Sequence, residues 1–202
     1  IDKSSCVDIQ IRAVVYKANG NIDMAISEYI KELSCHLSQN LKNGFVHSRL
    51  ASLYSDKKDY DKAVYYYKKA IEIRPNFAWT YGDYGRTLLV KGDWDEAEKM
   101  LKKALSLMDY GMAHYNLGGV YLYRGTFYLQ KGMIAEAERE YDKALLERPD
   151  DETVYNHFLL LYEKTDNCEM ILKVGERILI LNARNVSARK KIDYCNNKRR
   201  SK

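Results

Sequence analysis

The sequence predicts an all-α fold: a right-handed superhelical solenoid of about five helix-turn-helix units, followed by a C-terminal capping helix. Three observations predict it. A 34-residue pattern recurs along the chain, apolar residues are spaced three and four apart within each copy, and helix breakers are rare, with 2 Pro and 11 Gly in 202 residues. Apolar residues make up 46% and charged residues 30% of the chain, which is typical of a folded protein and argues against disorder.

The pattern is clearest when residues 44–76 are compared with residues 78–110. Small residues that would let two helix backbones approach closely recur in register, and larger residues that would fill the space between helices recur beside them. Ala63, Tyr67, Ala70 and Pro75 return 34 residues later as Ala97, Leu101, Ala104 and Asp109, and a third copy has Ala137, Tyr141, Ala144 and Pro149. We therefore expect each copy to form two antiparallel helices joined by a short turn.

With this period, and with the block Leu117-Gly118-Gly119-Val120-Tyr121, the chain resembles the tetratricopeptide repeat family over roughly Cys6 to Arg184. The resemblance implies one domain over residues 1–202. Its units would cover about 6–39, 44–77, 78–111, 112–151 and 152–185, with a linker of about four residues after the first unit and a capping helix and basic tail at 186–202. Gly and Asp suit helix ends and starts, so turns are expected at Gly20-Asn21, Lys58-Asp59, Gly92-Asp93 and Gly132.

The fourth unit contains an insertion in its first half. Gly118 precedes Ala137 by 19 residues, whereas Gly85 precedes Ala97 by 12, so the unit has seven extra residues. Seven residues are about two helical turns and keep the apolar face in register. We expect a lengthened first helix over about residues 112–131; the alternative is a short loop after which the helix restarts.

The four cysteines are Cys6, Cys35, Cys168 and Cys195, and they show no C-x-x-C pair and no metal-ligand spacing. Four cysteines allow three disulfide pairings, but a chain of this length can build a core without them. We expect free thiols, which favour a reducing compartment and hence the cytoplasm. The sequence gives no other indication of location.

The net charge of +5 comes from the last fifteen residues, because seven basic residues stand there against Asp193 alone. A nucleic-acid platform usually spreads its basic residues over one face of the fold, so nucleic acid is not the expected partner. The tail is expected to be a solvated end; the alternative is contact with an acidic partner, a membrane surface or nucleic acid. The longest run without charge is too short and too polar to span a bilayer.

No motif for phosphate binding, dinucleotide binding or hydrolysis occurs, and the four histidines fall in separate predicted helices. We therefore expect no enzyme activity, no catalytic residue, no metal site and no cofactor. The alternative is that the chain is a non-catalytic helper domain of a larger enzyme.

The resemblance implies that the first helix of each unit lines a concave groove, which would bind a protein or peptide partner. The Lys and Asn residues with which some family members hold a terminal carboxylate are absent from the corresponding positions. An apolar or aromatic anchor is expected instead, because large side chains lie beside small ones in the middle of the groove. The candidate peptide-binding residues are Phe45, Ser48, Ser52, Trp79, Gly82, Arg86, Met112, Tyr115, Tyr123 and Asn156.

Two alternatives to this binding groove stay open. Trp79 and Tyr115 could pack on each other between adjacent units and only cover the core. Exposed apolar surface on the end units or on the long fourth-unit helix could also allow the chain to self-associate.

Overall fold

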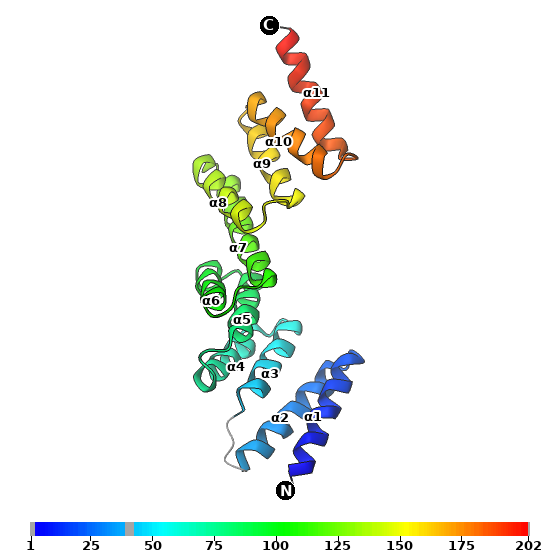
Figure 1. Cartoon of the computed structure of the whole chain (residues 1–202), viewed down its shortest axis with the longest axis vertical. Helices are drawn as coiled ribbons and strands as arrows, with labels where there is room; N and C mark the ends of the chain where they lie inside the picture. Colours follow the sequence, from blue (N-terminus) through cyan, green and yellow to red (C-terminus); the bar gives the residue numbers. More distant parts are fainter. Residues whose placement is uncertain (1–2, 39–42, 202) are drawn as a thin grey trace. The chain divides into compact units, whose positions relative to one another are not determined.

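The computed structural model describes residues 3–38 and 43–201, which form eleven α-helices and no strand (Figure 1). This confirms the predicted all-α fold. Residues 39–42, where the linker after the first unit was expected, lie outside the described part. The chain divides into two compact bodies, Ile1–Asn116 and Leu117–Lys202, which we call the N-terminal body and the C-terminal body.

Helix pairs build both bodies. The N-terminal body contains α1 (Lys3–Ala18) with α2 (Ile22–Ser38), α3 (Gly44–Asp56) with α4 (Tyr60–Ile73), α5 (Ala78–Lys91) with α6 (Trp94–Leu107), and the first turns of α7 (Gly111–Gln130). The C-terminal body contains the rest of α7 with α8 (Ile134–Glu147), then α9 (Glu152–Lys164) with α10 (Cys168–Leu181), and finally α11 (Val186–Arg200).

One residue with a left-handed backbone makes the turn inside each pair. Gly20, Gly92 and Gly132 have φ angles of 76°, 92° and 77°. Lys58 and Asp166 adopt the same region, with φ angles of 62° and 52°, although they carry side chains. Such a residue ends a helix and reverses the chain within a few residues. The four turns expected from the sequence lie where they were predicted.

Small residues bring the two helices of a pair into backbone contact. A Cβ atom placed on Gly85 of α5 would lie 3.2 Å from the carbonyl oxygen of Ala97 in α6. A Cβ atom placed on Gly125 of α7 would lie at the same distance, 3.2 Å, from the carbonyl oxygen of Ala137 in α8. Because the facing backbone cannot move aside, only a very small residue fits at this position.

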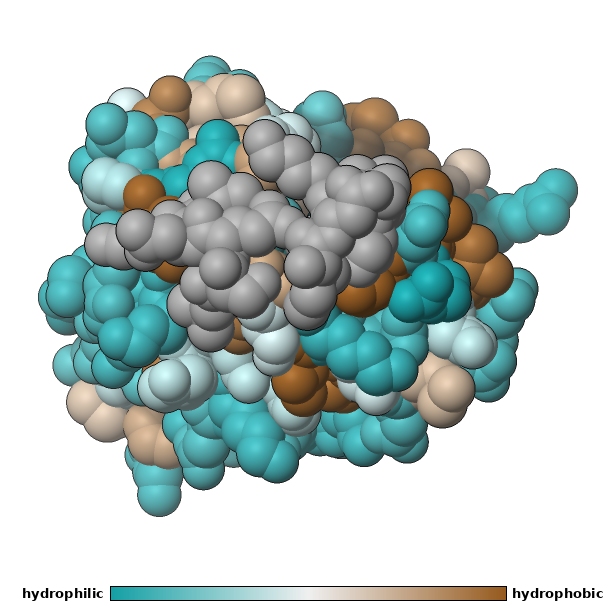
Figure 2. Space-filling view, turned by 90° about the horizontal axis from the view of Figure 1, so that it is seen from below, coloured by the Kyte–Doolittle hydropathy of each residue, from teal (hydrophilic) through white to brown (hydrophobic). Residues whose placement is uncertain are grey.

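The outer face of α1 exposes three apolar side chains. Ile11 is 56% exposed, Val14 44% and Val15 51%, and their spacing places them on one side of the helix. Figure 2, which views the molecule from below, shows apolar residues scattered within a mostly hydrophilic surface. Scattered apolar residues are normal on a protein surface, but a helical stripe of three marks an apolar face.

Helix α7 runs unbroken over 20 residues, whereas α5 has 14. The insertion therefore extends a helix, and the alternative of a loop with a restarted helix is wrong. A Cβ atom on Gly118 would lie 2.2 Å from the Cδ of Arg148, and one on Gly44 would lie 3.0 Å from the Cδ of Arg74. The two pairs have the same sequence spacing (44 to 74 and 118 to 148), so the repeat that includes α8 is counted from Gly118. The preceding unit, residues 78–111, already has 34 residues, so the extra residues are 112–117, which are six and not the seven expected.

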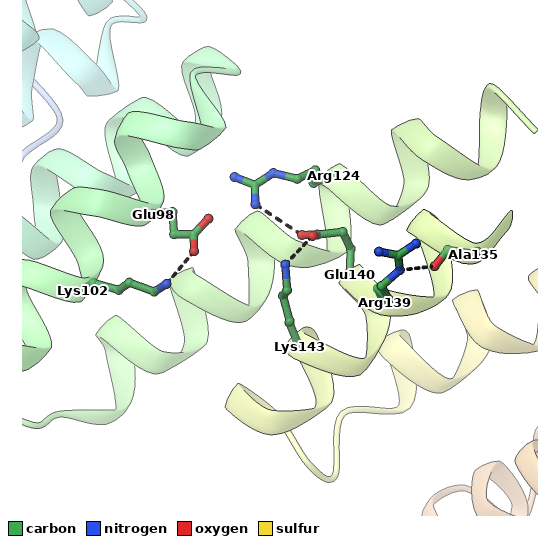
Figure 3. A network of polar contacts seen from close by, with 7 residues as sticks. All are labelled: Glu98, Lys102, Arg124, Ala135, Arg139, Glu140 and Lys143. Carbon is green, nitrogen blue, oxygen red and sulfur yellow. Dashed lines mark hydrogen bonds and ion pairs between the residues drawn. The ribbon is translucent and has the colours of Figure 1, made fainter. Parts of the chain in front are cut away.

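A buried glutamate joins the two helices of a pair. In the C-terminal body the Glu140 carboxylate accepts hydrogen bonds from Arg124 of α7, at 3.3 Å, and from Lys143 of α8, at 2.6 Å (Figure 3). The N-terminal body repeats this arrangement with the same spacing, in Glu28 with Arg12 and Lys31. Hydrogen bonds from Lys31 and Arg12 lower the pKa of Glu28, so this buried carboxylate stays ionised.

Helix α11 caps the C-terminal body, as expected. Gly175 of α10 makes room for Ile192 of α11, because a Cβ atom on Gly175 would lie 2.9 Å from the Ile192 Cγ1. Cys195 of α11 is fully buried and forms a disulfide with Cys168 of α10. The glycine that departs from the repeat pattern is therefore the docking point of the last helix.

The disulfide shows that the expectation of free thiols was wrong. Cys35 is also disulfide-bonded, and the side chain of Cys6 lies outside the described part. The sequence gave no local signal for the Cys168–Cys195 bond, because the two residues are 27 apart and meet only when α11 packs on α10. Disulfide-bonded Cys35, Cys168 and Cys195 give no support to a reducing compartment.

We expect the double substitution Cys168→Ser/Cys195→Ser to lower the free energy of unfolding by about 3 kcal/mol, because the disulfide closes a long loop and restricts the unfolded chain. Urea denaturation followed by circular dichroism measures the change. Wild-type protein in reductant should lose at least as much stability. Equal stability of the variant and the oxidised wild type would show that the disulfide does not hold α11 in place.

Candidate functional site

Two aromatic pairs occupy matching places in the N-terminal body. Phe45, near the start of α3, packs edge-on against Phe77, the residue before α5, with ring centroids 5.0 Å apart. Trp79, near the start of α5, packs on Tyr110, the residue before α7, at 4.5 Å. Phe45 remains 44% exposed and Trp79 49% exposed. Each ring is supported on one side and accessible on the other, as a binding anchor must be.

An arginine packs against both rings of the first pair. The guanidinium carbon of Arg74 stands 3.7 Å from the ring centroid of Phe45 and 4.5 Å from that of Phe77. The stem of Arg74 packs on Gly44, where a Cβ atom would come within 2.9 Å of its Cγ. These contacts hold a half-buried cation next to an exposed aromatic side chain.

Tyr110 fills the space beside Gly82 that the sequence suggested as part of a pocket. A Cβ atom on Gly82 would lie 1.8 Å from the Tyr110 hydroxyl oxygen. Burial, with a smaller contribution from the Asp83 carboxylate, raises the pKa of Tyr110 to about 12. Trp79 therefore packs on Tyr110 and not on Tyr115, the partner that the sequence suggested.

The polar candidates of the N-terminal body are held by the packing of α3 on α5. The Ser48 hydroxyl lies 2.8 Å from the Thr80 hydroxyl, and the Ser55 hydroxyl accepts a hydrogen bond from Thr87 at 3.0 Å. Ser52 and Arg86 are half-buried. Ser48 therefore already has a partner within the protein, and it serves the packing of the two helices.

The remaining candidates lie on α7 and α9. Met112 and Tyr115 are exposed on the first turns of α7 and belong to the N-terminal body. Tyr123 is exposed further along α7, in the C-terminal body. Asn156 of α9 is half-buried there, and its side-chain oxygen accepts a hydrogen bond from Asn185 at 3.4 Å. Eight of the ten candidates thus belong to the N-terminal body.

Sequence reasoning missed the residues that support the exposed rings. Phe77 and Tyr110 both stand directly before a first helix, and Arg74 follows α4. A signal was present in the sequence, since Phe77 is the last residue of one unit and Tyr110 the last but one of the next, and each unit has another aromatic residue near the start of its first helix.

A further pocket of about 480 Å³ lies in the C-terminal body, between α8, α9 and α10. Phe158, Val174 and Ile180 give it an apolar lining, and Lys173 and Arg177 stand at its edge. The pocket adjoins α10, the helix that packs against α11 at Gly175. The sequence had suggested an altered packing of this helix pair, but it did not predict a pocket.

The basic tail forms ion pairs with its own body. Lys191 pairs with Glu163 at the end of α9, and Lys198 pairs with Asp166 in the turn that follows. These contacts help to dock α11 and reduce the positive charge that the tail offers to a partner. Arg199 and Arg200 remain exposed.

Chemistry-bearing groups do not gather elsewhere in the described part of the chain. Within residues 3–38 and 43–201, no three His, Cys, Asp or Glu side chains lie together as they would around a metal ion. In the same residues, no helix has the length and apolar character needed to cross a bilayer. The N-terminal aromatic pairs are therefore the strongest candidate site.

We expect Gly82→Ala to push the Tyr110 ring away from Trp79, since the new methyl group would overlap the Tyr110 hydroxyl. The pKa of Tyr110 should then fall from about 12 toward its ordinary value of 10. An NMR titration of labelled tyrosine rings, with Tyr110→Phe for assignment, measures this shift. Gly111→Ala, where a Cβ atom meets nothing within 4 Å, should leave the pKa unchanged. An unchanged pKa in Gly82→Ala would refute the placement of Tyr110.

Comparison with solved structures shows the same fold. The crystal structure of MamA protein has a TM-score of 0.68 at 22% identity and covers 92% of this chain and 96% of its own. The structure of MamA residues 41 to the end from Desulfovibrio magneticus RS-1 has a TM-score of 0.66 at 16% identity. It covers 90% of this chain and 97% of that chain. The APC/C hetero-tetramer Cut9-Hcn1 has a TM-score of 0.52 at 17% identity. It covers 91% of this chain and 34% of that chain.

Comparison of sequences identifies the repeat. A family model described as tetratricopeptide repeat matches residues 45–77, and a second model with the same description matches residues 66–99. Protein STIP1 homolog from Dictyostelium discoideum is 30% identical over 101 residues, which are 50% of this chain and 18% of that protein. The chain thus spans less than a fifth of this curated relative. Residues 45–99 therefore form tetratricopeptide repeats, and the other helix pairs and turns of the described chain have the same fold.

Proposed function

We propose that this chain is a protein-interaction module whose N-terminal body binds a peptide or helix of a partner through the exposed rings of Phe45 and Trp79. Tetratricopeptide repeats support the general role of a protein-interaction scaffold. The observation that carries the specific proposal is the repetition of a half-exposed ring on a supporting ring in consecutive units.

Rings held in this way suit the role of binding anchors. An aromatic residue that is already packed on one side loses little conformational freedom when a partner covers the other side. Burial of a large apolar side chain then contributes more to affinity than a rim contact does. Met112 and Tyr115, also exposed on this body, extend the surface available to a partner.

The proposed role is non-catalytic. The groups that line this surface are aromatic rings, hydroxyls and arginines, and they offer no nucleophile with an adjacent base. The module would therefore act by holding its partner. Its place in any larger assembly depends on the partner that it recognises.

A display library of random peptides, selected on the immobilised full chain, tests the proposal. We expect the selected peptides to share an aromatic or large aliphatic anchor and to bind Trp79→Ala at least about tenfold more weakly. Tyr65→Ala is the matched control, because Tyr65 is an exposed tyrosine on α4 outside the candidate set. Peptides that bind Trp79→Ala and the wild type equally would contradict the proposal.

Self-association through α1 is a second proposal, supported by a comparison among the repeats. Val15 of α1 is 51% exposed, but the residues at the same repeat position in α3, α5 and α9 are at most 1% exposed. Those residues are Leu53, Thr87 and Leu161, whereas Phe127 at this position of α7 is 41% exposed. A position that is buried in three of the other repeats is apolar and uncovered in α1, so a second copy of the chain could cover it.

We expect the light-scattering mass of the full chain to rise from 23.6 kDa toward twice that value as its concentration increases. Ile11→Glu/Val15→Glu should keep the mass at that of one chain, because burial of two carboxylates in a pairing face is costly. Leu146→Glu/Ile180→Glu, which alters two exposed apolar residues of the C-terminal body, should associate like the wild type. A wild type that remains a monomer at every concentration would exclude self-association.

A further inference from the structure

The chain contains two equivalent arginines with different partners. Arg74 and Arg148 each follow the second helix of a pair and precede a proline. Their stems pack in the same way, Arg74 on Gly44 and Arg148 on Gly118. The repeat thus supplies a matched comparison, in which the position of the arginine is constant and its surroundings change.

The C-terminal arginine binds a carboxylate. The Arg148 Nη2 lies 2.9 Å from the Oδ2 of Asp151, three residues further along the chain, and both side chains are largely buried. In the N-terminal body the residue three positions after Arg74 is Phe77. A ring therefore stands where the other repeat provides an acidic partner, and none of the ion pairs of the described chain includes Arg74.

The two rings leave the hydrogen-bonding edge of Arg74 available. Phe45 and Phe77 contact the guanidinium through their rings, and a phenylalanine offers no acceptor. A guanidinium has five N–H donors, and within the described residues no side-chain hydrogen bond or ion pair uses those of Arg74. The rings also restrict the orientation of the guanidinium, which lowers the entropic cost of a bidentate contact with a carboxylate.

We propose that Arg74 is a carboxylate-binding site for the partner, so that the recognised segment carries an acidic residue next to its apolar anchor. The charge of Arg74 is complementary to such a residue, and the ring of Phe45 joins the two parts of the site. This inference rests on the proposed function, which supplies the anchor, and it adds the chemical class of the neighbouring residue. The matching contact inside the chain is that of Arg148 with Asp151.

Peptides selected from a random display library on the full chain test this inference. We expect the selected peptides to contain Asp or Glu next to the anchor. Replacement of that residue by its amide should weaken binding to the wild type about tenfold. Arg74→Gln should weaken binding of the acidic peptide by a similar factor, and the amide replacement should then have almost no further effect. That loss of additivity would locate the contact at Arg74.

Two further variants separate charge recognition from a change in packing. Arg74→Lys keeps the positive charge and should recover part of the affinity, while Arg177→Gln, which alters an arginine of the C-terminal body paired with Asp150, should bind like the wild type. Peptides without an acidic residue, or equal amide effects in the wild type and in Arg74→Gln, would overturn the inference. Loss of binding in Trp79→Ala in the same experiment would still leave the proposed function standing.

Discussion

The close approach of the two helices in each pair is the constraint on which the rest of the structure depends. Where Gly85 faces the backbone of Ala97, and Gly125 that of Ala137, a larger residue would force the helices apart. Each pair is therefore a rigid element with fixed side-chain directions. Because the helices are fixed, Phe45 and Trp79 each pack on a ring that stands directly before the next first helix.

Departures from the repeat pattern have definite structural consequences. The six residues inserted before Gly118 lengthen α7, and its first turns belong to one body and its remainder to the other. Gly175 replaces a large residue and receives Ile192, which docks α11. Phe77 stands where the later repeat has the acidic Asp151, and it contacts the guanidinium of Arg74. In each case the framework is kept and one local contact is exchanged, which changes the surface that the chain presents.

The sequence was sufficient to predict the framework, because its signal is periodic. Small residues in register, together with Gly20, Gly92 and Gly132 at the turns, specify helix pairs without knowledge of distant contacts. The contacts that join distant residues could not be predicted in this way. Cys168 and Cys195 meet only across packed helices, and Tyr110 reaches Gly82 from the following loop. The candidate site was therefore predicted as a list of exposed positions, and the structure added how Trp79 is supported.

Amide hydrogen exchange of the full chain, with and without a bound peptide selected on it, tests the central claim most directly. The account predicts slower exchange on peptide binding in the first turns of α3 and α5, where Phe45 and Trp79 lie, and in the segments that contain Phe77 and Tyr110. Exchange in α9 to α11 should be unchanged. Slower exchange confined to the C-terminal body, for example around the pocket between α8 and α10, would contradict it.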